Sequence, residues 1–341
     1  WPAATGGNGK GARSDRSQTG MADSGRLVLG VDIGGSSVKA GLVDALSGHL
    51  LGRHAQVLPA EAEARTEGVI MAALEAVASA AQGDAPHGAR VVAVGIACPG
   101  LLSGAVLRSS ANFPAWKDVD LEAVGRRLVP EAQRVAVAND ANACAAGEAA
   151  ADGPGPTCLA VVTLGTGVGV GVAIEGRPLS RNVELGHAII RPGGRACACG
   201  QAGCWEAYCG APAVAAAAAE ALAAWVGEPS VLRAALAAGR LTAQAVFEAA
   251  RAGDTAACAA VDGYVTALAL GVLITCRAYD PQVVVLAGGV SQAGEWLLER
   301  LRPALADLWW RLDAPPPVRL SAVDGRDAGI VGAAACARTA A

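Results

Sequence analysis

One histidine and three cysteines stand close together in the sequence, at His187, Cys197, Cys199 and Cys204. An imidazole with three thiolates is a soft nitrogen and sulfur ligand set, which is typical of a closed, four-coordinate Zn²⁺ site. The segments between the ligands, residues 188–196 and 200–203, contain glycine or proline, which let the chain turn so that separated ligands converge. The sequence therefore predicts a structural zinc site.

Two alternatives to this ligand set stay open. Cys209 is a fifth candidate for four positions, and by spacing it could replace Cys204. We prefer Cys204 because Cys209 lies beyond Trp205, where an alanine-rich helix is expected to begin. The second alternative is a group of buried thiols or a disulfide.

Two carboxylates flank the cysteine segment, Glu184 before it and Glu206 after it. A structural metal would hold two loops in place, so that both carboxylates face one pocket. The alternative is that both are solvated surface acids.

Two glycine-rich turns each join a pair of predicted strands. The first turn follows the strand at 26–33 and the second follows the strand at 158–164; they are made of Gly34, Gly35, Ser36 and Ser37, and of Gly165, Thr166 and Gly167. Since an extended segment and not a helix follows each turn, neither fits a Walker A loop or a dinucleotide fingerprint. Exposed N–H groups in such turns can surround phosphate oxygens, although plain hairpins are the alternative. Their repetition suggests two related halves that hold phosphates between them.

Two charged residues accompany the first turn. Asp32 precedes it and could hold Mg²⁺ through water, and Lys39 follows it and would add a cation for phosphate.

Polar residues also lie at predicted strand ends and in loops. Asp140 follows a predicted strand at 134–138, and doubly wound folds place catalytic groups at the carboxyl ends of strands. Asp140 is therefore the candidate general base, with an N-cap of the helix predicted at 143–150 as the alternative. Asn112, in the polar loop 110–114, could bind a hydroxyl group or form a turn.

Gly288 and Gly289 come between a predicted strand at 283–286 and a predicted helix from Gln292. Such glycines let a flat ring such as adenine approach the backbone, and close packing of helix on strand is the alternative.

Strands and helices alternate along the chain, which indicates an α/β protein. The 341 residues are enough for two domains. Residues 1–25 are rich in glycine, serine and arginine and are predicted to be disordered; a transit-peptide remnant and a start at Met21 both stay open. The remaining predicted elements are a strand at 90–96 and helices at 67–81, 213–226, 230–238, 242–250, 256–278 and 325–340.

The composition excludes several classes of protein. A net charge of −4 offers no bulk attraction to nucleic acid or anionic membrane, so neither is an expected partner. Long apolar stretches are alanine-rich and lack the bulky side chains of a membrane span. Ten cysteines in so long a chain do not form a disulfide scaffold, which favours a reducing, cytoplasmic setting.

Six motifs resemble those of the ROK family of sugar kinases and repressors, and the resemblance covers about residues 26–335. They are most similar to its bacterial ATP-dependent glucokinases, which share the zinc-segment spacing. The motifs are Asp32-Ile33-Gly34-Gly35, Asn139-Asp140, Leu164-Gly165-Thr166-Gly167, Glu184-Leu185-Gly186-His187, Gly288-Gly289, and Cys-x-Cys-Gly-x-x-Gly-Cys-x-Glu at 197–206.

The resemblance implies an actin-like, ribonuclease-H-like fold of two domains with the active site in the cleft between them. We expect a small α/β domain from 26–138 plus 325–341, and a large α/β domain from 139–324 that carries the zinc loop. By the family's pattern Asp140 takes the proton from the sugar hydroxyl, and the zinc ligands are the four named above. The sugar-binding residues would be Asn112, Asn139, Asp140, Glu184, His187 and Glu206.

The predicted activity is phosphorylation of glucose at its 6-hydroxyl with ATP and Mg²⁺. A kinase for N-acetylmannosamine, N-acetylglucosamine, fructose or allose is the nearest alternative, because the same side chains serve several sugars. A sugar-responsive repressor of the family would need a helix-turn-helix of ~60 residues, and only 25 irregular residues precede the first predicted strand.

Two departures from the family pattern bear on substrate choice. Many relatives carry Thr-Lys or Thr-Asn after the first Gly-Gly, whereas this chain has Ser36 and Ser37, somewhat as polyphosphate-using glucokinases do. Those enzymes, however, generally lack the cysteine segment. After Glu206, the usual serine-containing stretch is Ala-Tyr-Cys-Gly at 207–210. Family members are usually dimers or tetramers, so a homodimer or homotetramer is expected.

Overall fold

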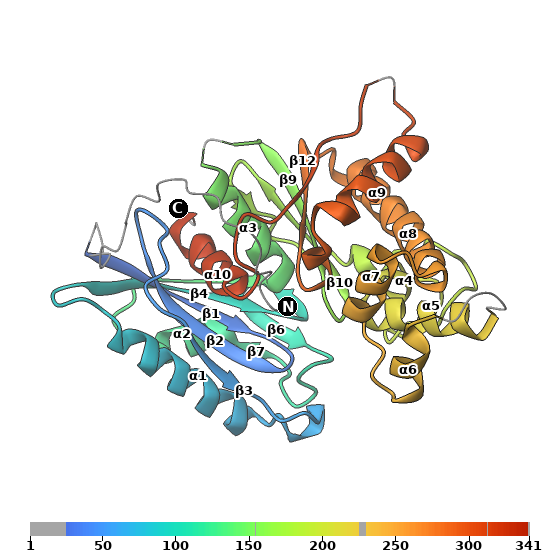
Figure 1. The fold of residues 1–341 in the computed structure, drawn as a ribbon. Helices are drawn as coiled ribbons and strands as arrows, with labels where there is room; N and C mark the ends of the chain where they lie inside the picture. The colour runs from blue at the N-terminus through green and yellow to red at the C-terminus, as the bar shows by residue number, and fades with distance from the viewer. Residues whose placement is uncertain (1–24, 154, 225–229, 312, 340–341) are drawn as a thin grey trace, which may run out of the picture.

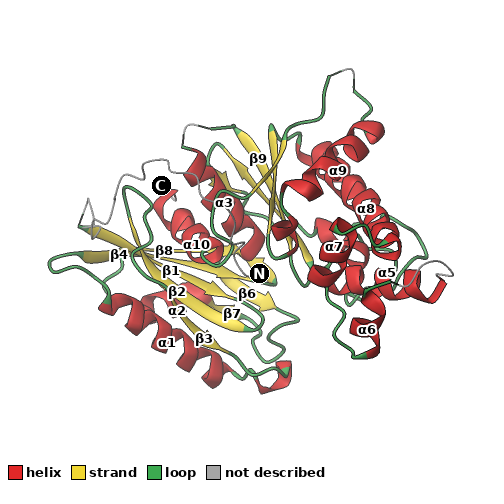
Figure 2. Ribbon diagram, viewed as in Figure 1, coloured by secondary structure: helices red, strands yellow, loops and turns green. Residues whose placement is uncertain are grey.

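The computed structural model describes residues 25–153, 155–224, 230–311 and 313–339. Nearly all of the segment predicted to be disordered, and the end of the helix predicted at 213–226, lie outside these residues. The chain forms two lobes, each built on a five-stranded mixed sheet (Figure 1). Helices lie on the outer side of both sheets and between them (Figure 2).

The two large sheets share one topology. In each, two consecutive antiparallel strands form a hairpin with a third strand at its edge, and two parallel strands continue the sheet on the other side. The first has the order β3-β2-β1-β4-β8 and the second β11-β10-β9-β12-β13. This repetition confirms the prediction of two related halves. The strands of the first are β1 (Arg26–Ile33), β2 (Ser37–Asp44), β3 (His54–Val57), β4 (Arg90–Cys98) and β8 (Arg134–Asn139); those of the second are β9 (Cys158–Leu164), β10 (Val168–Ile174), β11 (Arg177–Pro178), β12 (Val283–Ala287) and β13 (Val318–Leu320).

Several short strands escape sequence analysis. They are β3, β11 and β13 at or near the sheet edges, and a separate three-stranded sheet of β5 (Leu101–Ser103), β6 (Val106–Ser109) and β7 (Val119–Asp120). Each has four residues or fewer, too few for the alternation of apolar and polar residues to stand out.

The helices form three layers around the sheets. On the outer face of the first sheet lie α1 (Glu67–Gly83) and α2 (Leu121–Leu128), and between the two sheets lie α3 (Asp140–Asp152) and α10 (Ala328–Thr339). The outer layer of the second lobe is α4 (Glu206–Cys209), α5 (Ala211–Ala224), α6 (Leu232–Ala237), α7 (Ala243–Arg251), α8 (Thr255–Tyr279) and α9 (Glu295–Leu308); the 3₁₀ turns are η1 (Ala62–Ala64), η2 (Leu185–His187) and η3 (Val290–Ala293).

Three predicted helix starts are wrong. The helix predicted from 143 begins at Asp140, because Asn139 caps it by accepting a hydrogen bond from the backbone N–H of Ala141. The helix predicted from Gln292 begins at Glu295, after the turn η3 and a glycine with positive φ. The helix predicted from 325 begins at Ala328, because residues 324–327 form a turn.

Two central helices approach each other closely because glycine lies at their contact. A side chain on Gly332 of α10 would overlap the backbone of Ala143 in α3, and one on Gly147 would meet the backbone of Gly332. Only glycine permits this distance. The same holds at Gly171 of β10, where α3 lies on the second sheet. Helix α3 is therefore fixed against both lobes.

The 25-residue helix α8 has the length and hydropathy of a membrane-spanning segment. Of its most apolar window, however, 61% is buried inside the protein. It is the central core helix of the second lobe, with α5, α7 and α9 packed around it.

Candidate active site

The predicted metal ligands converge in space. One ligand atom from each of His187, Cys197, Cys199 and Cys204 lies within 4.8 Å of all the others. Nδ1 of His187 is 3.7 Å from Sγ of Cys197, and the Sγ atoms of Cys199 and Cys204 are 3.6 Å apart. A tetrahedral zinc ion with ordinary Zn–S and Zn–N bonds holds its ligand atoms about 3.5–3.8 Å from one another. The donor types and spacing therefore fit zinc.

The geometry does not support Cys209 or a disulfide in place of this ligand set. All ten cysteines are free, and 3.6 Å between sulfur atoms is far beyond a disulfide bond. Cys209 lies apart in α4, where its buried thiol is directed at the backbone carbonyl of Tyr264.

Backbone hydrogen bonds and one large side chain hold the cysteine loop. Cys197 N–H donates to the carbonyl of Gln201, and Trp205 N–H donates to that of Ala188. The Trp205 side chain is fully buried against α8, at Gly271, where any side chain would overlap the indole. The loop is thus anchored to the core of the second lobe.

Glu206 connects the cysteine cluster with the second glycine turn. One carboxylate oxygen accepts a hydrogen bond from the backbone N–H of Val168 at 3.0 Å, and the other lies 3.8 Å from Sγ of Cys197. Gly167 leaves room for this carboxylate, because a side chain there would overlap it. Glu206 is therefore not a solvated surface acid.

Glu184 and His187 lie at the two ends of the turn η2. The backbone N–H of His187 donates to the carbonyl of Glu184 at 2.9 Å, and Gly186 between them packs against the carbonyl of Val168. The Glu184 side chain is exposed. With Nδ1 facing the sulfur atoms, the imidazole of His187 keeps Nε2 for another partner.

Asp140 lies where the two lobes meet. Its carboxylate accepts a hydrogen bond from the N–H of Ala141 at 2.9 Å. Solvent reaches the side chain, but surrounding protein removes much of its hydration, and this burial raises its pKa to about 6. The hydrogen bond from Ala141 lowers the pKa, and the negative charges of Asp32 and Glu184 raise it. Since Asp32 belongs to the first lobe and Glu184 to the second, Asp140 faces acids from both.

Because Asn139 is the residue that caps α3, the N-cap alternative for Asp140 is wrong. The carboxylate of Asp140 needs another explanation. Its position directly after the carboxyl end of β8, an edge strand of the first sheet, suits a functional group.

The first glycine turn lies next to Asn112. A side chain on Gly35 would stand 2.7 Å from the Oδ1 atom of Asn112. Beside the turn, Lys39 Nζ pairs with Asp32 Oδ2 at 3.1 Å, so the two charges predicted to act separately on phosphate and Mg²⁺ neutralise each other here. Ser36 and Ser37 complete the turn, with Gly34 N–H donating to the Ser37 carbonyl at 2.9 Å.

Gly288 lies beside the second glycine turn. Its φ is +90°, and a side chain there would meet the carbonyl of Leu164, the residue before Gly165. The backbone of Thr166 in that turn packs closely against Gly210. Gly289 has open space around it. A cavity of ≈ 460 Å³ opens beside Gly288; it is lined by Gly288, Ser291, Gln292, Gly294, Leu320, Ser321, Ala322, Val323, Asp324 and Gly325.

Sequence analysis missed residues that hold this site from behind. The buried Arg65 donates to the carbonyl of Asn112 at 3.0 Å and so fixes its loop. Glu148, buried in α3, binds the loop after β13. A buried charged side chain must be paired. A single Glu in an alanine-rich helical sequence was therefore the signal that could have identified Glu148.

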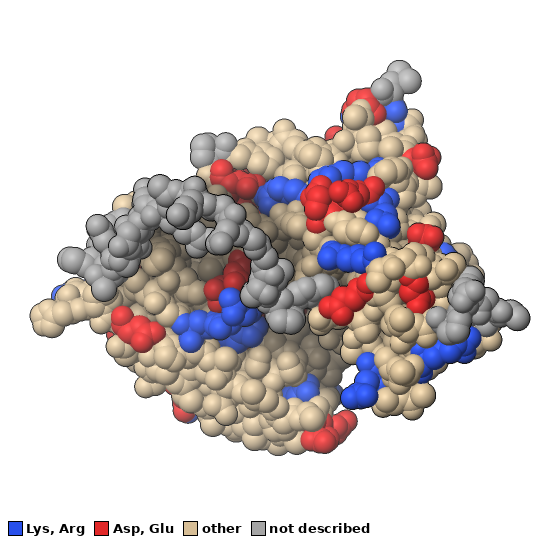
Figure 3. Space-filling view, in the orientation of Figure 1, with Lys and Arg blue, Asp and Glu red and all other residues tan. Residues whose placement is uncertain are grey.

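Charged residues are mixed over the face seen in Figure 3, which is hollowed where the lobes meet. Among the described residues of that face, Lys and Arg lie interspersed with Asp and Glu. This distribution agrees with the modest net charge of −4.

A model of the ROK family matches residues 28–340. The chain belongs to the ROK family. Its similarity to two glucokinases extends over nearly the whole of each protein: 33% identity over 324 residues for that of Thermotoga maritima, covering 90% of this chain and 96% of the relative, and 33% over 334 residues for that of Streptomyces coelicolor, covering 92% and 98%.

A solved ROK structure agrees with this assignment. The ROK family glucokinase from Streptomyces griseus, in complex with glucose and AMPPNP, superimposes with a TM-score of 0.74 at 30% identity, and the match covers 92% of this chain and 99% of that one. The family and the actin-like two-domain ATPase fold predicted from the sequence are thus confirmed.

Proposed function

We propose that this ROK protein is an ATP-dependent hexose kinase that converts glucose to glucose 6-phosphate. The similarity to glucokinases over nearly the full chain supports the reaction. The observation that carries the mechanism is Asp140, a carboxylate with a pKa raised to about 6 where both lobes meet. A general base works best when its pKa lies near the working pH.

In the proposed reaction Asp140 accepts the proton of the sugar 6-hydroxyl. The hydroxyl oxygen forms a bond to the γ-phosphorus of ATP while the bond from that phosphorus to the β,γ-bridging oxygen breaks, and ADP leaves. Phosphoryl transfer depends mainly on positioning and charge stabilisation. The protein supplies these through the glycine turns and the side chains around Asp140.

The sugar would be held by side chains from both lobes. Asn112 reaches from beside the first glycine turn, and Asn139 precedes Asp140. His187 and Glu206 lie at the cysteine cluster, and Glu184 lies at the start of the turn that ends in His187. Hydroxyl groups need both donors and acceptors, which amide, carboxylate and imidazole groups together provide.

Zinc is the metal best suited to the cluster of His187, Cys197, Cys199 and Cys204. Four protein ligands leave no open position, so the ion would be structural. It would orient the His187 ring, whose Nε2 then faces the sugar, and would keep Glu206 in position through the cysteine loop.

The nucleotide phosphates would lie between the two glycine turns, which are Gly34, Gly35, Ser36 and Ser37, and Gly165, Thr166 and Gly167. Asp32 would bind Mg²⁺ through water, and Lys39 would then be free to approach a phosphate. Mg²⁺ neutralises charge that develops on the transferred group. The adenine would enter the cavity beside Gly288 and Gly289.

We propose a small-molecule substrate and no nucleic-acid or membrane partner, because a net charge of −4 offers no bulk attraction to either. We further propose a cytoplasmic enzyme, which keeps its ten thiols reduced. A homodimer or homotetramer is the assembly we expect.

A panel of hexoses and amino-hexoses, assayed with ATP and with polyphosphate, tests the function. We expect the highest kcat/KM with glucose and ATP, and release of ADP coupled to glucose 6-phosphate. Preference for N-acetylmannosamine or polyphosphate would reassign the substrate or the donor. Lack of ADP release with every hexose would contradict the kinase assignment.

A further inference from the structure

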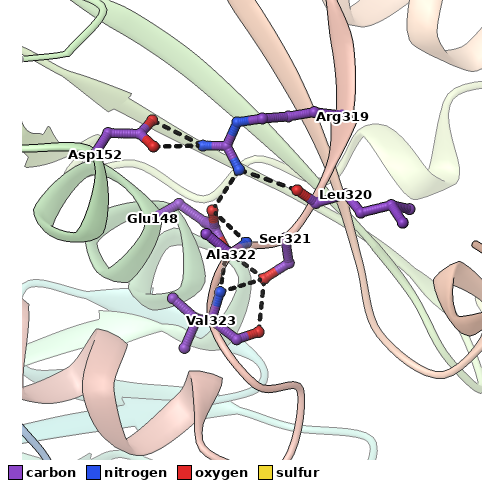
Figure 4. Close-up of polar contacts among 7 residues, drawn as sticks. All are labelled: Glu148, Asp152, Arg319, Leu320, Ser321, Ala322 and Val323. Atoms are coloured by element: carbon purple, nitrogen blue, oxygen red, sulfur yellow. Dashed lines mark hydrogen bonds and ion pairs between the residues drawn. The ribbon is translucent and has the colours of Figure 1, made fainter. Parts of the chain in front are cut away.

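The buried carboxylate of Glu148 lies in the middle of α3 and is only 2% exposed. It accepts four hydrogen bonds from the strand β13 and the loop that follows it (Figure 4). Oε2 accepts from Arg319 Nη1 at 2.9 Å and from Ala322 N–H at 3.3 Å. Oε1 accepts from Val323 N–H at 3.3 Å and from the Ser321 hydroxyl.

Arg319 balances the negative charge of Glu148. Its second guanidinium nitrogen makes two hydrogen bonds to Asp152, at 2.9 and 2.7 Å, one turn further along α3 (Figure 4). Burying a carboxylate is costly unless it is paired and fully hydrogen-bonded. Arg319 and the backbone N–H groups of Ala322 and Val323 can only donate, so they match the two acceptor oxygens of a carboxylate in that position.

The loop held by Glu148 forms one wall of the cavity beside Gly288. Ser321, Ala322 and Val323 line this cavity, whereas Glu148 is not among its lining residues. Glu148 therefore contacts the wall from behind. Gly288 and Gln292 line the same cavity.

Glu148 shares its helix with Asp140, which is the first residue of α3. One rigid helix thus carries the proposed base at its start and the anchor of the cavity wall two turns later. Gly147, next to Glu148, packs on α10 and so prevents the helix from shifting.

We propose that Glu148 is a positioning residue for the nucleotide: it fixes the backbone of residues 321–323 as the wall of the adenine pocket, in register with Asp140. This inference rests on the proposed function, because it takes the cavity as the site of ATP. Glu148 itself does not contact a substrate in this proposal.

The decisive variant is Glu148→Gln, which keeps the shape of the side chain but places an NH₂ group against donors. Hydrogen bonds to a charged group are roughly twice as strong as neutral ones. We expect the KM for ATP and the Kd for ADP, measured by calorimetry, to rise about tenfold. The KM for glucose should change less than about twofold, because the sugar-binding side chains lie elsewhere.

A second, milder variant keeps the test informative if Glu148→Gln fails to fold. Ser321→Ala removes one hydrogen bond to Glu148 and leaves the ion pair with Arg319 intact. We expect a smaller rise, about threefold, in the same two nucleotide constants. The matched control is Glu122→Gln on α2, where an exposed pair with Arg126 is lost. It should leave all constants unchanged.

Unchanged ATP and ADP constants in both variants, or an equal rise in the KM for glucose, would overturn the inference. If the role of Glu148 were purely structural, the variants would have a lower melting temperature, and the KM for ATP would not rise more than the KM for glucose. Nucleotide binding is measured without a sugar, so it does not depend on which hexose is the substrate. If the wild-type protein binds ADP but phosphorylates no hexose, the proposed function fails, and the ADP constants still test the role of Glu148.

Discussion

Glu206 accepts a hydrogen bond from the backbone N–H of Val168, at 3.0 Å, across the glycine turn that joins β9 and β10. Its second carboxylate oxygen lies 3.8 Å from Sγ of Cys197. One side chain therefore touches the proposed phosphate-binding turn and the proposed metal cluster. A displacement of the turn should therefore displace the cluster, and the reverse.

Gly167→Ala tests this connection. The new methyl group would overlap the Glu206 carboxylate, so the side chain must leave its hydrogen bond with Val168. A displacement of about 1 Å near reacting groups costs on the order of 10²-fold in rate. We expect kcat/KM for glucose to fall by about 10- to 100-fold, measured by coupled assay.

Gly68→Ala on α1 is the matched control, because a methyl group there meets nothing within 4 Å. Its kcat/KM should equal that of the wild type. Near-wild-type activity of Gly167→Ala would show that the Glu206 carboxylate is not needed where it lies.

Asp140→Asn should remove the base and retain the local structure. An asparagine Oδ1 can still accept the hydrogen bond from Ala141 N–H. General base catalysis contributes typically about 10² to 10⁴-fold, so kcat should fall by at least that factor. Glucose binding, followed by calorimetry, should stay within a few-fold of the wild type.

Asp307→Asn, at an exposed position of α9, is the control and should keep full activity. Turnover of Asp140→Asn near the wild-type rate would remove Asp140 from the proposed role.

The pH dependence of activity follows from the pKa of about 6 at Asp140. Only the ionised carboxylate can accept the proton, so kcat/KM should be constant above about pH 7. It should fall about tenfold per pH unit well below pH 6. The acid limb should be absent from the residual activity of Asp140→Asn. An acid limb near pH 4 would indicate a base with an unshifted pKa.

The same shift predicts an effect on stability. Because the folded state raises the pKa from an ordinary value of 3.8 to about 6, it favours the protonated form of Asp140. The stabilisation from this preference is complete below about pH 4 and is lost as the pH rises through 6. Asparagine imitates the protonated form. The melting temperature of Asp140→Asn should therefore exceed that of the wild type by more at pH 8 than at pH 5. A difference that is independent of pH would contradict this account.

Sequence could predict the parts of the site whose chemistry is local. Residue type and the intervening turn residues predicted that His187, Cys197, Cys199 and Cys204 converge, as they do, and the position after a strand indicated Asp140 as the candidate base. The two glycine turns, read as a repeat, gave the two-lobed architecture with its two matching sheets.

The supports of the site depend on contacts between distant segments, which no local pattern encodes. Glu148 and Arg319 are 171 residues apart, and Arg65 is 47 residues from the Asn112 carbonyl it holds. The hairpin places Lys39 opposite Asp32, but the ion pair between them was not predicted. The sequence interpretation had assigned a separate ligand to each charge. The short edge strands escaped because they are stabilised by neighbours and not by their own composition.

Cys199→Ser should release the metal and loosen the sugar site. A serine hydroxyl is a poor zinc ligand, so three ligands would remain for an ion that structural sites bind with four. The His187 ring and the loop before Glu206 would then lose their common anchor. We expect zinc content, measured by atomic absorption, to fall from one ion per chain to a small fraction. The KM for glucose should rise about tenfold or more, as for loss of a group that orients a ligand.

Cys158→Ser is the control, because its thiol lies outside the cluster and is directed at the carbonyl of Tyr279 at 3.6 Å. It should keep its zinc and its KM. Full zinc occupancy in Cys199→Ser would mean that another residue completes the site, and an unchanged KM after zinc loss would separate the metal from sugar binding.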